Sequence, residues 1–297
     1  MATYVFSDVH GHAATLDRLL ERVQPGEGDR IFMLGDMIDR GPDPVGVLKT
    51  CRSLNESGAC ILMGNHEDLM LSYFEDSDDP TNVTNWLING GATTSEGLFA
   101  LPEAERIELL DWVANLPLYA YAVVEGRPYI MVHAGIRPNI RVVRPGRAGA
   151  SGEGSDAEGA SGRPGEKAAL PMAMGWSEED LTALLEAQSP EDLLWIRDAF
   201  WGHPTGLLDE RGRGPIVIAG HTPTVYLEGM ADRPNRSPVD EDGLCRMVRV
   251  GASAETYGVA DRWDIDCGAA GGAGFGKLLM LRVDDEIEFY EPIREGE

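Results

Sequence analysis

The sequence predicts an α/β fold whose first part is a parallel sheet. Three short apolar runs, at 3–6, 30–34 and 59–63, alternate with segments that carry the apolar spacing of amphipathic helices. Strands and helices that alternate in this way form a parallel sheet with right-handed crossovers. A polar cluster follows each run. At the carboxyl ends of parallel strands such clusters lie together, where open α/β sheets bind ligands.

Each predicted helix of this first part has its own signals. The first helix has an apolar stripe and ends before Pro25, with His12 interpreted as a surface residue at its start. The second helix begins with Pro42 and Pro44, and the third begins after Gly64. The stripe of the first helix, which is expected to face the sheet, consists of Leu16, Leu19, Leu20 and Val23.

The middle of the chain predicts a helical cap and a hairpin. Helical segments near 82–89 and 102–115 follow an acidic turn. Two β-rich runs at 118–124 and 128–132 are separated by a short glycine-containing turn, which is typical of a β-hairpin. Further along, Ser177 is followed by acidic residues as in a capping box, so a helix is expected there.

The last third predicts a second, mostly antiparallel sheet. Its candidate strands lie at 247–250, 263–266, 277–283 and 287–290, after a strand at 215–219. We expect a single domain over residues 1–297, with a loop at 228–244. The segment 146–165 has seven glycines in twenty residues and cannot bury a core, so it is predicted to be a surface insertion.

The composition is that of a globular protein with a strongly acidic surface. Of its 297 residues 43% are hydrophobic, and 50 acidic residues against 25 basic ones give a net charge of −25. Such a surface repels nucleic acids and anionic membranes, so neither is expected as a partner. A high acid content also simply increases solubility, and this explanation stands beside any specific role.

The cysteine pattern and the start of the chain indicate a cytoplasmic protein. The four cysteines show no CxxC spacing and no framework of a small secreted protein, so they are expected to be reduced thiols. The sequence enters a predicted strand almost at once and has no apolar run of membrane length.

The clusters that follow the predicted strands contain good metal ligands. Carboxylate, imidazole and amide oxygen together suit manganese, iron or zinc, and manganese is the favoured ion. Six side chains are too many for one catalytic zinc, but with Asp36 shared they are enough for two divalent cations. The six candidate ligands are Asp8, His10, Asp36, Asn65, His133 and His221.

Each candidate ligand also has a structural alternative. Asp8 fits a helix N-cap, Asn65 fits a turn residue, and His133 and His221 fit histidines bonded to backbone at strand ends. Four of the chain's six histidines nevertheless fall in strand-end motifs with an adjacent glycine, which lets the backbone approach closely. The structural alternatives are therefore reasonable for single residues but explain the whole set poorly.

Four further residues are predicted to take part in catalysis without holding metal. His66 can protonate a leaving group, and Asp39 can hold His66 in its protonated form. Arg40 and Arg197 can bind phosphoryl oxygens bidentately, which arginine does better than lysine. An ordinary salt bridge is the alternative for both arginines.

Five motifs in a fixed order resemble those of the calcineurin-like metallophosphoesterases. The Asp-Arg pair of the second motif and the glutamate of the third resemble the phosphoprotein phosphatase branch, which includes bacterial and phage serine/threonine phosphatases and symmetrical diadenosine tetraphosphatases. The resemblance covers roughly Thr3 to Pro223 and also Asp266-Cys267-Gly268. The motifs are Asp8-Val9-His10-Gly11, Gly35-Asp36-Met37-Ile38-Asp39-Arg40-Gly41, Gly64-Asn65-His66-Glu67, His133-Ala134-Gly135 and Gly220-His221-Thr222-Pro223.

The resemblance implies a two-sheet β-sandwich flanked by helices, with a dinuclear metal site at the rim of the strands. It implies that Asp8, His10 and Asp36 hold one cation. It also implies that Asp36 holds the second cation together with three further ligands, which are Asn65, His133 and His221. Ala134 stands where eukaryotic members have glycine, which points to the bacterial members.

The predicted function is a metal-dependent phosphomonoesterase that acts on phosphoserine and phosphothreonine in proteins. A metal-bridging hydroxide would attack phosphorus in line, and His66 would protonate the departing alkoxide. The alternative is the same chemistry on a dinucleoside tetraphosphate or another small phosphate. A third alternative is a scaffold that has lost catalysis and binds protein. The presence of all six candidate ligands and both arginines argues against it.

Overall fold

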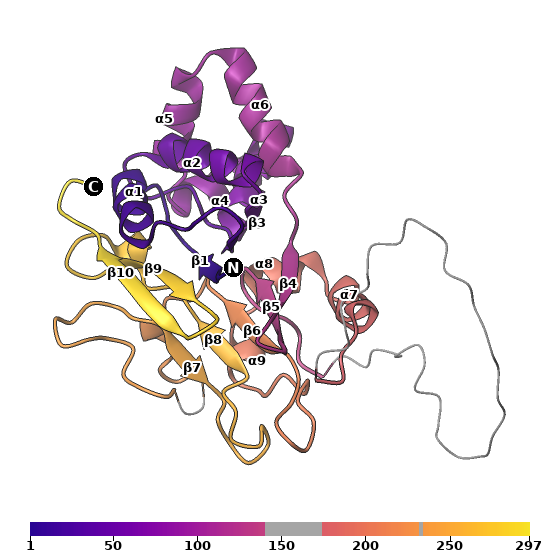
Figure 1. Cartoon of the computed structure of the whole chain (residues 1–297). Coiled ribbons are helices and arrows are strands. Elements are labelled where there is room, and N and C mark those ends of the chain that lie inside the picture. The colour runs from indigo at the N-terminus through magenta and orange to yellow at the C-terminus, as the bar shows by residue number, and fades with distance from the viewer. Residues whose placement is uncertain (140–173, 232–233) are drawn as a thin grey trace.

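The fold is described by a computed structural model covering residues 1–139, 174–231 and 234–297. The predicted insertion at 146–165 lies outside these residues. The described parts form four layers in which two sheets pack face to face and helices cover both outer sides (Figure 1). This confirms the two-sheet sandwich flanked by helices.

The first sheet begins as the sequence predicts. β1 (Thr3–Phe6), β2 (Arg30–Met33) and the short β3 (Cys60–Ile61) pair in parallel, in the order β1-β2-β3. α1 (Ala13–Val23) and α2 (Pro44–Glu56) are the crossovers between them. His12 is the N-cap of α1 and is buried, contrary to its prediction as a surface residue, because its ring packs against the chain end and its Nδ1 lies 2.8 Å from the carbonyl oxygen of Glu297.

The second sheet is mixed and has the order β4-β5-β6-β8-β7. β4 (Tyr119–Val124) and β5 (Arg127–Val132) form the predicted hairpin, and β6 (Ile216–Ala219) lies parallel to β5. β8 (Arg262–Asp264) pairs in parallel with β6 and antiparallel with β7 (Val248–Val250).

The last two strands do not belong to the second sheet, so the prediction that the last third forms a sheet of its own is wrong. β9 (Lys277–Arg282) pairs antiparallel with β1, and β10 (Ile287–Pro292) pairs with β9 at the edge of the first sheet. The reason is the continuous apolar run of β9. Its side chains are buried on both faces of the first sheet, with Met280 in the core under the helices and Leu279 between the sheets.

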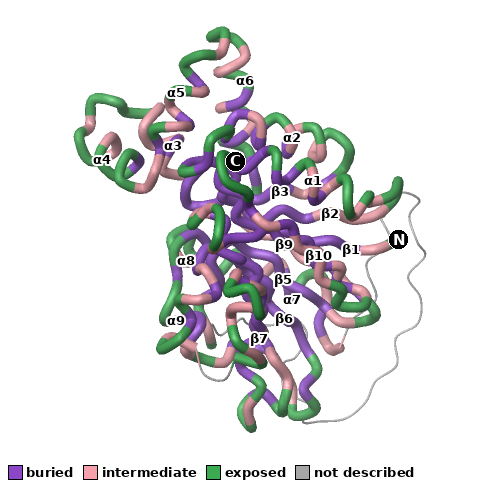
Figure 2. The backbone as a smooth tube through the Cα atoms, turned by 90° about the vertical axis from the view of Figure 1, so that its left-hand side faces the viewer, coloured by how far each residue is buried: buried purple, intermediate pink, exposed green. Residues whose placement is uncertain are grey.

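Three apolar cores hold the layers together, and the burial of the central strands is visible in Figure 2. One lies between the first sheet and its helices, the second lies between the two sheets, and the third lies between the second sheet and α7, α8 and α9. β1 shows how alternation produces this arrangement, because Phe6 points into the first core and Val5 into the second.

Helices α3 to α6 form a cap that extends from one end of the first sheet (Figure 1). Their bounds are α3 Asn65–Glu75, α4 Pro80–Ile88, α5 Ala92–Ala100 and α6 Glu103–Ala114. The sequence predicts α4 and α6 near their observed positions but misses α5 as a separate helix. α5 has four small or hydroxyl-bearing residues in its first four positions and therefore little helical apolar pattern.

The outer face of the second sheet is covered by α7 (Glu178–Glu186), α8 (Pro190–Trp195) and α9 (Asp198–Trp201). The predicted capping box is present, since the hydroxyl of Ser177 accepts from the backbone N–H of Asp180 and the carboxylate of Asp180 accepts from that of Ser177. None of the described helices is both long and apolar enough to cross a membrane. All four cysteines are free thiols.

Candidate metal centre

The loops that follow five strands meet at one edge of the sandwich and carry the predicted ligands there. The loop after β1 carries Asp8 and His10, and the loop after β2 carries Asp36. The other three predicted ligands are the first residue of α3 after β3, and residues that follow β5 and β6 directly, namely Asn65, His133 and His221. All six side chains are buried, with at most 5% of their surface exposed.

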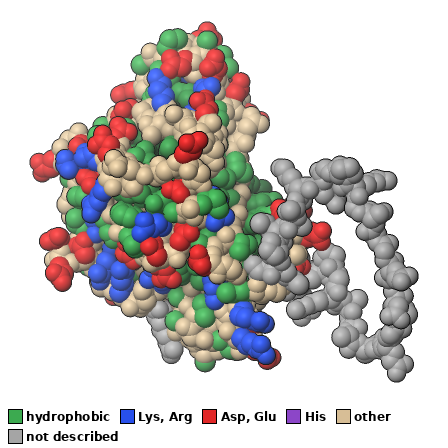
Figure 3. All heavy atoms as spheres, in the orientation of Figure 1, with side chains coloured by type: hydrophobic (Ala, Val, Ile, Leu, Met, Phe, Trp, Pro, Cys, Tyr) green, Lys and Arg blue, Asp and Glu red, His purple; other side chains and the backbone are tan. Residues whose placement is uncertain are grey.

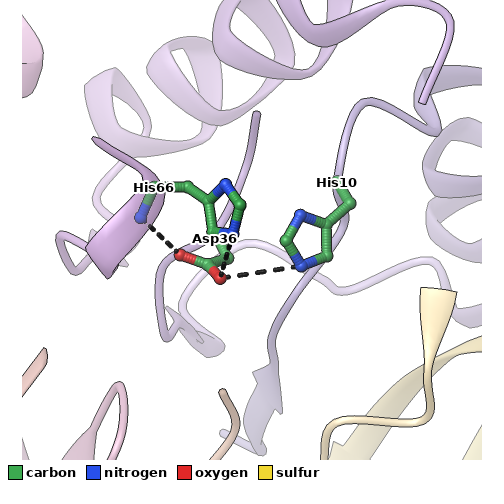
Figure 4. A group of neighbouring side chains, drawn as sticks. All are labelled: His10, Asp36 and His66. Carbon is green, nitrogen blue, oxygen red and sulfur yellow. Dashed lines mark hydrogen bonds and ion pairs between the residues drawn. The ribbon is translucent and has the colours of Figure 1, made fainter. Parts of the chain in front are cut away.

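A first group of possible ligands surrounds one oxygen of Asp36 (Figure 4). Its Oδ2 lies 3.6 Å from Nε2 of His10 and 3.8 Å from Nε2 of His66. The two imidazole rings stand edge to face, with centroids 4.8 Å apart. These three side chains are close enough to hold one cation.

A second group lies on the other side of the same carboxylate. It consists of Asp36, His133 and His221. The amide oxygen of Asn65 lies between the two imidazoles, 2.9 Å from Nε2 of His133 and 2.8 Å from Nδ1 of His221. Asp36 is therefore common to both groups, as a bridging carboxylate would be.

The hydrogen-bonding pattern of His133 fits a bound cation. Its Nδ1 lies 2.8 Å from the carbonyl oxygen of Leu34 and can bond it only as an N–H donor, so Nε2 carries a lone pair. That Nε2 faces the amide oxygen of Asn65 and lies 3.4 Å from Oδ1 of Asp36. Three acceptors thus face one another without a proton between them, and a divalent cation satisfies all three.

His10 repeats this arrangement in the first group. Its Nδ1 lies 3.0 Å from the carbonyl oxygen of Ile38, which leaves the lone pair on Nε2 directed toward Asp36. Burial lowers the pKa of His10 and also that of His221, so both imidazoles are neutral, which is the form that binds metal.

The centre also has an excess of buried negative charge. Burial, with the neighbouring charges of Asp266 and Asp36, raises the pKa of Asp8 well above its usual value. Burial likewise raises the pKa of Asp266 to about 7. Carboxyl groups in such surroundings lack a compensating cation, and divalent metal ions would supply it. The donor set and the charge therefore both fit metal ions.

Asp8 and His66 lie differently from their predicted roles. The carboxylate of Asp8 accepts the backbone N–H of His221 at 3.0 and 3.1 Å and the hydroxyl of Ser7, and it lies outside both ligand groups. His66 lies inside the first group, although the sequence predicts it as the acid. Asp8 in the structure joins the loop after β1 to the loop after β6.

The predicted acid pair is in contact. Nδ1 of His66 lies 2.6 Å from Oδ2 of Asp39. Burial lowers the pKa of His66, but the charge of Asp36 and the hydrogen bond to Asp39 outweigh it and raise the pKa above its usual value. The cap supplies two residues that the sequence did not reveal. Trp86 of α4 donates its indole N–H to Asp39 at 3.1 Å, and Thr94 of α5 donates its hydroxyl at 2.6 Å.

Glu67 is a second contribution that sequence reasoning missed. Its buried carboxylate accepts four backbone N–H groups, those of Gly64, Asp36, Met37 and Ile38, at 2.8 to 3.3 Å. Burial raises its pKa to about 7, and the backbone donors oppose this shift. Glu67 thus fixes the loop of Asp36 against the start of α3. The signal available in the sequence was a glutamate at the third position of a helix.

The two arginines lie at the mouth of the centre. Arg40 approaches Nε2 of His66 at 3.0 Å, and Nε of Arg197 donates to Nε2 of His221 at 2.9 Å. Both are exposed, and neither takes part in an ion pair with the described residues. They line, with Asp36 and other residues of the centre, a cavity of about 340 Å³. Their guanidinium groups are therefore available to an anion in that cavity.

The backbone around the centre is strained. Of the twelve non-glycine residues with positive φ in the described part of the chain, half are predicted site residues. A non-glycine residue in this conformation costs roughly 1–3 kcal/mol and persists where the surroundings enforce it, often at functional sites. The six are Asp8, His10, Asp36, Asp39, Arg40 and His221, with φ between 46° and 69°.

This fold and this cluster of histidines and carboxylates define a metallophosphoesterase architecture, and comparison with known proteins agrees. A profile described as calcineurin-like phosphoesterase matches residues 1–252, so the chain belongs to that family. A solved structure of a protein provisionally named a diadenosine tetraphosphatase superimposes with a TM-score of 0.54 at 16% identity. The superposition covers 99% of this chain and 94% of that one, and it supports the fold alone.

Curated relatives match part of the chain. A symmetrical bis(5'-nucleosyl)-tetraphosphatase of Proteus mirabilis (strain HI4320) is 34% identical over 141 residues, which are 46% of this chain and 46% of the relative. The enzyme of the same name from Pseudomonas fluorescens (strain SBW25) is 36% identical over 140 residues, or 46% of this chain and 44% of the relative. The chain thus spans about half the length of the curated relatives it matches.

Proposed function

We propose that the chain is a metal-dependent phosphoesterase that hydrolyses a phosphate ester or anhydride at the candidate metal centre. The observation that carries this proposal is the shared carboxylate of Asp36, which lies between two groups of buried imidazoles. As the sequence predicts, Asp8, His10 and Asp36 would hold one cation, for which Asp8 would turn from its present contact with the backbone of His221. Asp36, Asn65, His133 and His221 would hold the other. Two divalent cations would supply a nucleophile at neutral pH and offset the charge of the phosphate.

Arg40 and Arg197 are the groups of this chain that would bind the phosphate. They approach the centre from two sides, from the loop after β2 and from the N-terminus of α9. A guanidinium group bonds two phosphate oxygens at once, so the pair would orient phosphorus toward the metal ligands. In the present structure both guanidinium groups lie against imidazole nitrogens instead.

His66 would act as the acid that protonates the leaving group. The side chain lines the cavity, and its contact with Asp39 favours the protonated ring. Asp39 in turn is held by Trp86 and Thr94, so the pair is anchored to the cap. A proton at Nε2 of His66 would face the cavity, where an alkoxide leaves.

Two substrate classes fit this chemistry. The sequence predicts phosphoserine and phosphothreonine in proteins, for which an exposed pair of arginines and a general acid are suitable. The names of the curated relatives favour the second class, dinucleoside tetraphosphates. Manganese is the ion we favour for both, from the mixture of imidazole and carboxylate ligands.

The test measures metal content and turnover of the whole chain. We expect two manganese ions per chain after loading and hydrolysis of p-nitrophenyl phosphate. Asp36→Asn should abolish turnover and lower metal content, because it removes the bridging charge between two cations. Full metal content with near-normal turnover in this variant would refute the dinuclear site. Parallel assays on a phosphopeptide and on diadenosine tetraphosphate then separate the two substrate classes.

A further inference from the structure

The cavity at the candidate metal centre has two exposed aromatic walls. Trp195 and Tyr226 both line it, and 36% and 56% of their surfaces are exposed. Large aromatic side chains are usually buried in the core of a protein or in contact with a ligand. Among the described residues only four aromatic side chains are this exposed, and two of them line this one cavity.

Both side chains lie on short helices next to residues of the candidate centre. Trp195 ends α8 two residues before Arg197, and its ring stands edge to face with the imidazole of His221 at 6.0 Å. Tyr226 lies in the 3-10 helix Thr224–Leu227, which begins just after His221. The aromatic walls and the phosphate site are therefore positioned by the same segments of backbone.

A third aromatic residue of the cavity has a structural role instead. Phe275 packs so closely over the turn at Gly268 and Gly271 that a Cβ atom at Gly271 would come within 2.2 Å of its ring. It also belongs to the core between the two sheets. Trp195 and Tyr226, in contrast, are exposed.

We infer that Trp195 and Tyr226 form a stacking site for the base of a nucleotide whose phosphate lies between Arg40 and Arg197. This inference rests on the proposed function and specifies its substrate class as nucleoside phosphates. A cavity of about 340 Å³ is within the range that holds small ligands. Stacking on exposed aromatic rings is how proteins hold unpaired bases, whichever base it is.

Charge also favours a small substrate. The chain carries a net charge of −25, and acidic side chains are scattered over the face shown in Figure 3. An acidic surface gives little attraction to an extended acidic phosphopeptide, whereas a nucleotide needs only the arginine pair and an apolar wall. Phosphoserine has no ring that these walls could stack on.

The test compares two competitors that differ only in the base. AMP and ribose 5-phosphate are measured as inhibitors of p-nitrophenyl phosphate turnover by the manganese-loaded chain. In the wild type AMP should bind about 5- to 100-fold more tightly, the range expected for one stacked base. Tyr226→Leu and Trp195→Leu should each reduce this ratio, and Tyr226→Phe should keep it. Because both inhibition constants use one reporter, the reporter's own contact with the rings cancels.

Tyr257→Leu is the matched control, since the exposure of Tyr257, 49%, lies between those of Trp195 and Tyr226, and Tyr257 does not line the cavity. It should retain the wild-type ratio. The kcat/KM for diadenosine tetraphosphate should fall in Tyr226→Leu by the same factor as the ratio for AMP. Equal inhibition by AMP and ribose 5-phosphate in the wild type would overturn the inference. So would a loss in Tyr226→Leu that is confined to a phosphoserine peptide.

A second readout separates this inference from the proposed function. Binding of AMP and ribose 5-phosphate to the manganese-loaded chain is followed by tryptophan fluorescence, with Trp195→Leu identifying the signal of Trp195. Absence of p-nitrophenyl phosphate turnover together with preferential quenching by AMP would refute the proposed reaction and retain the stacking site. Turnover without any quenching that depends on Trp195 would refute the stacking site and retain the proposed reaction.

Discussion

Glu67 shows at the level of one residue how the loop of Asp36 is held. Its two carboxylate oxygens each accept two backbone N–H groups. Glu67→Gln keeps the shape but turns one oxygen into an amide group that faces two donors. We expect this variant to lower the free energy of unfolding by about 2–3 kcal/mol, as for lost hydrogen bonds to a charged group. Urea unfolding followed by circular dichroism measures the change.

Glu75→Gln is the control for this prediction, because Glu75 lies on the same helix and is exposed. Its stability should remain within about 0.5 kcal/mol of the wild type. If Glu67→Gln were equally neutral, the four backbone donors would find water, and Glu67 would not organise the loop.

His66 is predicted to act only where the leaving group needs a proton. A serine alkoxide is a poor leaving group and needs a proton as the P–O bond breaks, whereas p-nitrophenolate leaves readily without one. His66→Asn should therefore reduce kcat more on a phosphopeptide than on p-nitrophenyl phosphate, by up to the ~10²–10⁴-fold typical of acid catalysis. Asp39→Asn should show a weaker form of the same pattern, since it removes the carboxylate that holds the ring.

Metal content decides how a different result is interpreted. His66 lies close enough to Asp36 to belong to a ligand group, so the variants are analysed for manganese as well as for rate. If His66→Asn retains its metal and loses kcat equally on all substrates, His66 would serve substrate binding and not proton transfer. Loss of metal from His66→Asn would instead make His66 a ligand and leave the acid unidentified.

At the scale of secondary-structure elements, the cap contributes to the centre through α4 and α5. The indole N–H of Trp86 in α4 reaches Asp39 at 3.1 Å. Trp86→Phe keeps an aromatic ring in the core but removes this donor, so Asp39 orients His66 less well. We expect kcat on poor leaving groups to fall about 3- to 10-fold, from one lost hydrogen bond.

Trp112→Phe provides the comparison for this prediction. Trp112 of α6 also donates its indole N–H to a side chain, that of Asn55 at 3.0 Å, but this contact is remote from Asp39. Both variants should lose some stability. Only Trp86→Phe should change the ratio of rates for poor and good leaving groups, and a similar ratio in both would assign Trp86 to the core alone.

The strands show a second effect at this scale. β9 reads locally like any apolar strand near the end of the chain, and sequence reasoning placed it in the later sheet. Its position beside β1 depends on the free edge that β1 offers and on the burial of both faces of β9. Neither can be read from the sequence of β9 itself.

At the scale of the whole molecule, the segment 146–165 is predicted to be dispensable. It contains no apolar pattern that could join one of the three cores. Long surface loops cost little to shorten, so its deletion should leave the melting temperature and p-nitrophenyl phosphate turnover close to those of the full chain. A fall of more than about 10 °C would show that the segment packs against the fold.

The identity and order of the loops that form the centre can be predicted from local sequence patterns. Asp8, Asp36 and His133 each follow an apolar strand, and the carboxyl ends of parallel strands lie at one edge wherever the chain continues. The position of a ligand directly after an apolar strand depends only on residues adjacent in the chain, so it is visible in the sequence.

The side chains that support and surround that centre depend on tertiary packing, which local patterns do not show. Trp86 and Thr94 reach Asp39 across about fifty residues of sequence, and Trp195 meets Tyr226 at one cavity from two separate turns. No period or motif marks these residues, because each sits in an ordinary helix or turn. Their partners are set by how helices pack on the sheets, and packing depends on the shape of the whole core rather than on any short stretch of residues.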